Sequence, residues 1–257
     1  MSGPARSSVF TGMPRVVAAE ALDGLAADDL SAMRSRRDLQ RVHRVMGSRA
    51  IVASALRSLT TLHRPAAPLR VLELGAGDGT LMLGVARSLK PHWPTVELEL
   101  LDRQQLVSPA TLRAYAALGW QTRARVSDVF DWVSGGSGPR PQRWDLIVVN
   151  LFLHHFEGAP LKSILAAVAQ RSHRFFACEP RRSRLALAGS HLIGLMGANA
   201  VTREDAVLSV HAGFAQGEMA ALWPPGGAGW TLKDYPAGLF SHCFFASRSP
   251  PQTRAGA

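Results

Sequence analysis

An acidic residue and three glycines stand at every second position in one stretch of the chain. Glu73, Gly75, Gly77 and Gly79 end an apolar run that begins at Leu69. Glycine readily adopts positive φ and lets the backbone approach a ligand closely. The free N–H groups and partial positive charge of a helix N-terminus favour an anionic group. The spacing therefore predicts a turn, between a buried strand and a helix, that binds a nucleotide-like ligand.

A strand and a helix must flank this turn to hold it. The apolar run up to residue 74 suits a strand that is covered on both faces, as in a parallel sheet. The helix is predicted over residues 80–89. A dinucleotide-binding turn would place its third glycine at position 80, which is Thr80 here. NAD binding and a glycine turn without a ligand are therefore the weaker interpretations.

The whole string Glu73-x-Gly75-x-Gly77-x-Gly79 resembles motif I of the class I S-adenosylmethionine (SAM) dependent methyltransferases. The resemblance implies a cofactor that enters as SAM and leaves as S-adenosylhomocysteine (SAH). It also implies cofactor contacts from the residues of the turn, namely Glu73, Gly75, Ala76, Gly77 and Gly79.

An acid ends the second predicted strand, which covers residues 95–101. Asp102 can accept hydrogen bonds from both hydroxyls of a ribose, by the logic that operates in dinucleotide-binding folds. Arg103 follows it and is a further candidate for contact with the cofactor. This feature indicates an adenosine-containing ligand but does not separate SAM from NAD.

Another acid follows the third predicted strand, near residues 121–126. Asp128 and Val129 stand where class I methyltransferases contact adenine with an acid and the next backbone N–H. The resemblance implies that Asp128 binds the exocyclic amine of the adenine. An Asp that caps the following helix is the other interpretation of the local pattern.

Two histidines follow the fourth predicted strand, residues 144–150. The string Asn150-Leu151-Phe152-Leu153-His154-His155-Phe156 resembles motif IV of small-molecule methyltransferases related to the ubiquinone-biosynthesis type. Open α/β sheets bind ligands at this carboxyl edge of the strands. The resemblance therefore implies that Asn150 and Leu151 lie near the cofactor and that a histidine lies near the methyl.

A histidine at this point could act as the general base for a hydroxyl acceptor, because His titrates near neutral pH. Adjacent side chains are expected to point in different directions. We predict that His154 faces the pocket and His155 the protein interior. A structural role for both, ordering the loop, is the alternative.

Several other classes of methyltransferase fit the sequence poorly. Enzymes that methylate exocyclic amines of DNA or RNA bases carry prolines after this strand, where this chain has Leu151 and Phe152. RNA cytosine enzymes need a cysteine there, but Cys178 and Cys243 stand in later apolar runs that predict buried, inert thiols. A cluster of carboxylates for Mg²⁺ is missing as well, so no metal is expected.

Helical segments are expected to cover the site from two parts of the chain. Residues 15–64 predict an N-terminal helical cap, in which Arg44 could pair with the carboxylate of SAM. Residues 184–222 predict a lid over the acceptor, with His191 and His211 as candidate substrate contacts. Before the lid, Glu179 is expected to form an ion pair with one of three arginines, Arg181, Arg182 or Arg184.

The chain ends in a predicted β pair over residues 230–235 and 242–247, typical of the methyltransferase sheet. The predicted fold class is α/β: a Rossmann-like seven-stranded sheet with the last strand antiparallel, helices on both faces and the helical cap. The SAM-binding domain is expected over residues 65–248, and residues 1–14 and 249–257 are expected to be disordered tails.

The formal charge of +10 invites a nucleic-acid interpretation, but only three of the 29 basic residues are lysines. An Arg, Ala and Gly bias of this kind is typical of GC-rich coding, so a nucleic-acid partner is not favoured. The sequence predicts neither a signal peptide nor a membrane span. We expect a cytoplasmic monomer or homodimer.

The predicted reaction is SAM-dependent methyl transfer to a small, largely apolar acceptor, such as a phenolic or polyketide-type hydroxyl. The enzyme's main task would be to hold the acceptor in line with the S–CH₃ bond. Two alternatives stay open: an RNA or ribosome-associated methyltransferase, and a protein that uses the SAM fold without methyl transfer.

Overall fold

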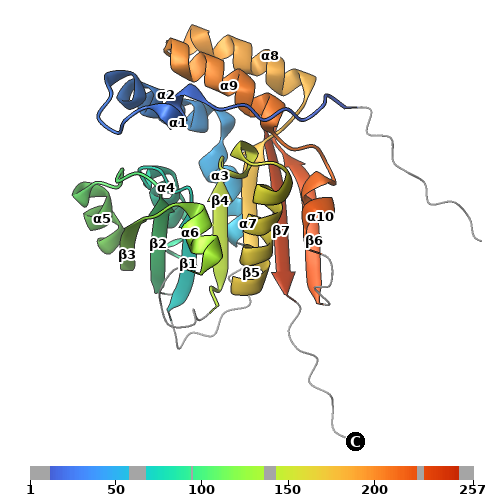
Figure 1. The fold of residues 1–257 in the computed structure, drawn as a ribbon. Coiled ribbons are helices and arrows are strands. Elements are labelled where there is room, and N and C mark those ends of the chain that lie inside the picture. Colours follow the sequence, from blue (N-terminus) through green and yellow to red (C-terminus); the bar gives the residue numbers. More distant parts are fainter. Residues whose placement is uncertain (1–11, 58–67, 94, 136–142, 225–228, 249–257) are drawn as a thin grey trace, which may run out of the picture.

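A single mixed sheet of seven strands organises the protein (Figure 1). The computed structural model describes residues 12–57, 68–93, 95–135, 143–224 and 229–248. The strand order is β3-β2-β1-β4-β5-β7-β6, and only β7 runs antiparallel to its neighbours β5 and β6. The strands are β1 (Leu69–Leu74), β2 (Val96–Asp102), β3 (Trp120–Val126), β4 (Leu146–Asn150), β5 (Arg174–Pro180), β6 (Trp230–Ala237) and β7 (Ser241–Arg248). The predicted fold class is confirmed.

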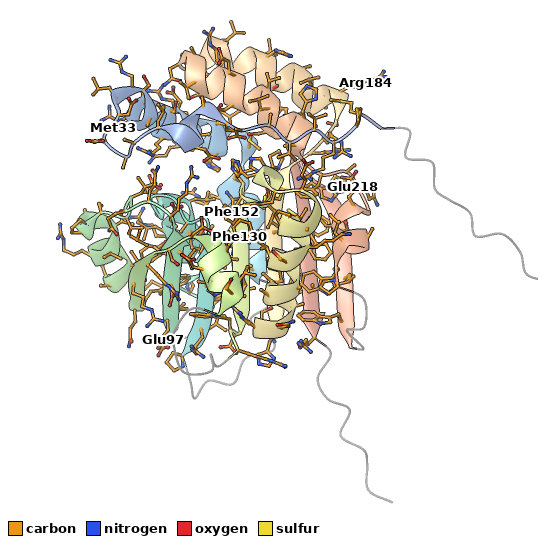
Figure 2. The ribbon with its side chains drawn as sticks, viewed as in Figure 1. Met33, Glu97, Phe130, Phe152, Arg184 and Glu218 are labelled. Atoms are coloured by element: carbon orange, nitrogen blue, oxygen red, sulfur yellow. The ribbon has the colours of Figure 1, made fainter. Side chains whose placement is uncertain are left out.

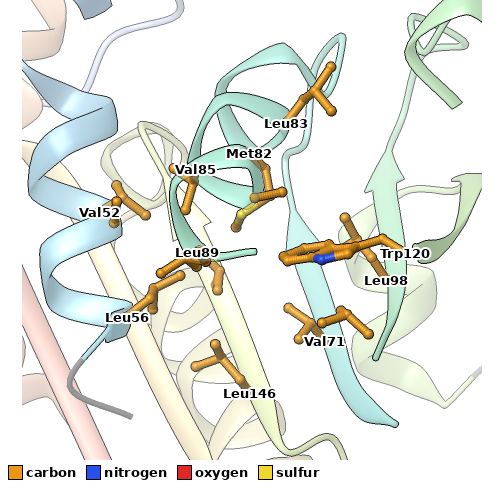
Figure 3. Packing of buried hydrophobic residues seen from close by; sticks show 14 of the residues in the cluster. Val52, Leu56, Val71, Met82, Leu83, Val85, Leu89, Leu98, Trp120 and Leu146 are labelled. Atoms are coloured by element: carbon orange, nitrogen blue, oxygen red, sulfur yellow. The ribbon is translucent and has the colours of Figure 1, made fainter. Parts of the chain in front are cut away.

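Helices cover both faces of the sheet, because its central strands are apolar on both sides. One face packs against α3 (Ser48–Arg57), α4 (Thr80–Leu89) and α5 (Pro109–Ala116). Figure 3 shows Val52 and Leu56 of α3 meeting Val85 and Leu89 of α4 in this core. The other face packs against α6 (Val129–Ser134), α7 (Gly158–Arg171) and α10 (Glu218–Leu222).

The four remaining helices form one cap above the carboxyl ends of the strands (Figure 1). They are α1 (Ala21–Gly24), α2 (Leu30–Met46), α8 (Arg184–Leu192) and α9 (Ala200–Ala212), with the short η3 (Ile193–Met196) after α8. Ser35 Oγ of α2 lies 3.1 Å from Asn199 Oδ1 at the start of α9, and Asp38 accepts from Asn199 N at 2.9 Å. These bonds join the predicted cap and the predicted lid into one layer.

The structure narrows both predicted helical regions. Helix α3 does not belong to the cap expected over residues 15–64. Its apolar face, with Val52, Ala53 and Leu56, packs against the sheet instead of covering the site. Helix α10 does not belong to the lid expected over residues 184–222. Its Met219 is buried on the sheet face that also packs against α6 and α7. Residues 58–64 of the predicted cap lie outside the described residues.

The N-terminal segment packs against the protein from Met13 onward, inside the range expected to be a loose tail. Arg182 Nε donates to Met13 O at 2.7 Å, and Arg15 lies over the ring of Phe214, 4.5 Å from its centre. The predicted tails at residues 1–11 and 249–257 lie outside the described residues. Among the described helices, none is both long and apolar enough to span a membrane.

Candidate functional site

A cavity of about 1070 Å³ lies between the carboxyl ends of the strands and the helical cap. The chain leaves β1 for β2 on one side and reaches β4 on the other, so the sheet order reverses at this point. Open α/β sheets form their ligand crevice at such a reversal. Figure 2 shows Phe152 and Phe130 at this upper edge of the sheet, below the cap.

The glycine turn after β1 forms one wall of the cavity. Gly75, Gly77 and Gly79 have φ of 69°, 57° and 71°, a conformation that side chains disfavour. A Cβ at Gly77 would meet nothing within 4 Å, so the backbone there borders open space. Gly77 N donates to Asp102 Oδ2 at 2.8 Å, which orients the carboxylate beside the turn.

Glu73 is 3% exposed, and its Oε2 has no hydrogen-bond partner within the described part of the chain. Burial, with smaller contributions from Asp78 and Asp102, raises the pKa of this carboxyl to about 8. A buried acid that lines a cavity and has one oxygen without a partner is suited to a cationic ligand group.

Further predicted residues line the cavity where strands β3 and β4 end. Asp128 accepts from Phe130 N at 2.7 Å and caps α6, so it performs the helix-capping role while it lines the cavity. Asn150 is buried, and its Oδ1 has no partner in the regions described. Leu151 has φ of 50°, which is rare without glycine and marks a constrained site.

His154 lies between two carboxylates. Its Nδ1 is 2.8 Å from Glu179 Oε2, and its Nε2 is 3.3 Å from Glu20 Oε1. Its side chain is 3% exposed. Burial alone would lower the pKa of His154, but hydrogen bonds to Glu179 and Glu20 outweigh it and raise the pKa to about 9. At neutral pH the ring is therefore doubly protonated and donates from both nitrogens.

The prediction that Glu179 pairs with an arginine was wrong. Strand β5 continues to Pro180, and Glu179 near its end accepts instead from Phe152 N at 3.2 Å and Leu153 N at 2.9 Å, as well as from His154. It thereby holds the short helix η2 (Leu153–His155) that follows β4. Arg182 pairs with Glu218 instead.

The two histidines do not point apart as predicted. Their rings lie side by side, with centres 4.2 Å apart, and both line the cavity. His155 Nδ1 is 3.1 Å from Asp23 Oδ2, and its side chain is 20% exposed. Asp23 also lies 3.3 Å from the guanidinium of Arg103, so Arg103 reaches the cap as well as the cavity.

Four predicted site residues lie outside the cavity. One is Gly79 of the glycine turn, where a Cβ would meet the side chain of Leu100 at 2.9 Å rather than the cavity. Arg44 is exposed, and its Nε points back toward Gln40 O of its own helix at 3.5 Å. His191 is exposed on α8, and His211 is half-buried on α9. Arg44 was chosen from the basic side of a predicted helix, and the two histidines were chosen as the titratable members of the predicted lid. Neither argument determines which side of a helix meets the cavity.

The structure brings other side chains to the cavity that the sequence analysis missed. They include Glu20, Arg36, His43, Phe152, Gln104 and Ser209. One signal could have indicated Glu20, because it is the single charged residue in the apolar stretch of residues 16–22.

One cluster has the donor types of a metal site. Ligand atoms of Glu20, His154 and His155 all lie within 4.8 Å of one another. However, carboxylates already engage both nitrogens of His154 and Nδ1 of His155. The expectation that no metal takes part stays a prediction.

The strand order and the glycine turn at the sheet reversal together define the fold of SAM-dependent methyltransferases. Comparison with solved structures supports this assignment. The chain is similar to the plantazolicin methyltransferase BpumL in complex with a triazolic desmethylPZN analog and SAH, at TM-score 0.59 and 12% identity over 87% of this chain and 98% of that one.

Two further solved structures have the same fold. One is the plantazolicin methyltransferase BamL, at TM-score 0.57 and 13% identity over 82% of this chain and 90% of that one. The other is the CurJ carbon methyltransferase, at TM-score 0.58 and 15% identity over 87% of this chain and 59% of that one. The sequence matches no protein-family model and no curated protein.

Proposed function

We propose that the protein is a SAM-dependent methyltransferase that acts on a small, largely apolar acceptor at a phenolic or polyketide-type hydroxyl. The observation that carries the proposal is the cavity of about 1070 Å³ above the glycine turn. Single-ligand pockets occupy about 300–1,000 Å³, so this cavity has room for a cofactor and an acceptor together.

The cofactor end of the cavity has groups for each part of SAM. Gly75 and Gly77 border the space for the amino-acid tail, and the unpartnered carboxyl of Glu73 suits its ammonium group. Asp102 would bind the ribose hydroxyls, because the two N–H groups it accepts leave lone pairs on both carboxylate oxygens. Asp128 would bind the adenine amine at the N-terminus of α6.

The acceptor end lies under the cap and is mostly apolar. Its lining includes Val17, Leu22, Ala186, Ile193, Met196, Val210 and Phe240. The solved neighbours BpumL and CurJ are named as a plantazolicin methyltransferase and a carbon methyltransferase, which supports methyl transfer as the activity.

SAM supplies a methyl that is already activated on a sulfonium, so the protein's residues must orient the acceptor and manage its proton. His154 is one of the residues that manage this proton, as the sequence indicates. Because its pKa is raised to about 9, its ring is protonated at neutral pH and donates to its carboxylate partners instead of accepting a proton from the acceptor.

The test uses the full chain, SAM with an isotopically labelled methyl, and a panel of apolar phenols and polyketide-type hydroxyls. We expect label on at least one hydroxyl of the panel. Binding of SAM with no label on any member would instead favour a non-catalytic SAM-fold protein. Label that enters total RNA alone would favour the RNA alternative.

A further inference from the structure

One acid on the cavity wall comes from a segment that the sequence analysis did not connect with the chemistry. Glu20 immediately precedes α1, lines the cavity and has a side chain that is 12% exposed. Its Oε1 accepts from Ser209 Oγ of α9 and lies 3.3 Å from His154 Nε2. No described residue donates a hydrogen bond to its Oε2, which leaves that oxygen for a ligand.

Contacts on both sides fix the position of Glu20. Asp205 of α9 accepts from Ala21 N at 2.7 Å and from Leu22 N at 2.9 Å. Before Glu20, Val16 N donates to His211 O at 3.1 Å. Arg15 donates to Ala212 O at 2.8 Å and to Phe156 O beyond η2 at 2.9 Å. Glu20 is therefore held against both α9 and the segment of η2 that carries the two histidines.

His154 is poorly placed to touch the acceptor itself. Its Nδ1 donates to Glu179, and its Nε2 faces Glu20, so neither nitrogen is left for a third partner. In the chain Glu179–His154–Glu20, only the last member has an oxygen without a partner among the described residues. His154 thus holds Glu20 in place and balances its charge.

We propose that Glu20 Oε2 binds the reacting hydroxyl of the acceptor and takes its proton, with His154 as a positioning residue. This inference rests on the proposed function. The acceptor oxygen forms its bond to the methyl carbon as the S–C bond breaks, with that electron pair left on sulfur and the hydroxyl proton on Glu20. Glu20 therefore acts only on acceptors that carry a proton on the atom that is methylated, and an acceptor that is already ionised does not need it.

The charged and titratable groups around Glu20 come from three elements. His154 and His155 face it from η2, Asp205 contacts its neighbours from α9, and Asp23 follows it in α1. Burial and the histidines act on the pKa of Glu20 in opposite directions, and the net effect is a lowered pKa. Glu20 is therefore ionised at neutral pH and ready to accept a proton.

The test compares Glu20→Gln with the full-length wild-type protein on two phenols that differ in ionisation. One probe, 4-methylphenol, is un-ionised at neutral pH, and the other, 2,4-dinitrophenol, is ionised. We expect Glu20→Gln to lower kcat on 4-methylphenol by about 100-fold, the usual contribution of a general base. On 2,4-dinitrophenol, which has no proton to lose, kcat should fall less than about threefold. An equal loss on both probes would overturn the proton-acceptor role.

Two controls separate this role from folding and from the proposed function. SAH affinity should stay within about twofold in Glu20→Gln, and Glu204→Gln, an exposed acid on α9, should leave both rates unchanged. If the wild-type protein methylates neither phenol, the proposed function fails on these acceptors and the role of Glu20 in them fails with it.

A spectroscopic readout needs no turnover. In the ternary complex with SAH, 4-nitrophenol should ionise at lower pH in Glu20→Gln than in the wild type, because the carboxylate disfavours the phenolate. An unchanged ionisation would overturn the contact between Glu20 and the acceptor.

Discussion

Replacing Gly75 with Ala tests the packing of the glycine turn most sharply. The new Cβ would lie 2.9 Å from the Cβ of Phe152 and closer still to two carbons of its ring. Phe152 cannot easily move, because its N–H donates to Glu179 and its ring packs on Phe156 with centres 5.1 Å apart. Gly75 also has φ of 69°.

The expected cost has two parts. The left-handed backbone costs an alanine about 1–2 kcal/mol, and overpacking against a held side chain costs about 1–3 kcal/mol more. Gly77→Ala is the matched control, since it has the same sign of φ but nothing within 4 Å of its Cβ. We expect Gly75→Ala to lose about 2–5 kcal/mol and Gly77→Ala about 1–2 kcal/mol.

Urea unfolding of the single variants and of Gly75→Ala with Phe152→Ala measures both parts. The double variant should recover about 1–3 kcal/mol relative to the sum of the two single changes, because the clash partner is gone. Equal losses at Gly75 and Gly77, or strict additivity with Phe152→Ala, would refute the close contact.

Two further predictions concern charge, and a third concerns a metal ion. Because the pKa of Glu73 is raised to about 8 in the folded protein, its contribution to stability is full below pH 4.5 and is lost as the pH rises to 8; Glu73→Gln should abolish this loss of about 1.4 kcal/mol per pH unit, as urea titrations at several pH values would show. Arg182→Ala should lower the unfolding free energy by about 3–5 kcal/mol. The change removes the ion-pair partner of Glu218 and the hydrogen-bond donor to the backbone carbonyls of Met13 and Gly213. A loss below about 1 kcal/mol would contradict this. Dialysis against a chelator should leave methyl transfer unchanged, and a loss that zinc restores would instead assign the cluster of Glu20, His154 and His155 to a metal.

The parts of the site that follow directly from a strand could be predicted from the sequence. Gly75, Gly77 and Asp102 stand next to strands whose apolar runs are unmistakable, and parallel strands bring their carboxyl ends together. The order of the sheet then places these residues in one cavity without further information.

The parts that depend on distant packing could not be predicted. Glu20 meets His154 across 134 residues of chain only because Asp205 and Arg15 hold its segment. Arg44 was assigned to the cofactor from its helical face, yet the rotation of α2 is set by Asp38 and Ser35 bonding to α9. Three arginines lie close to Glu179 in the sequence, but the direction of strand β5 points its side chain toward η2.

Calorimetric titration of the full chain with SAH tests the central claim most directly. We expect one SAH per chain, with affinity lowered about 10- to 100-fold in Asp102→Ala, since a charged hydrogen-bond acceptor is worth about 1.5–3 kcal/mol, and unchanged in Arg44→Ala. Absence of binding heat at any temperature, or equal affinity in Asp102→Ala, would contradict a cofactor site above the glycine turn.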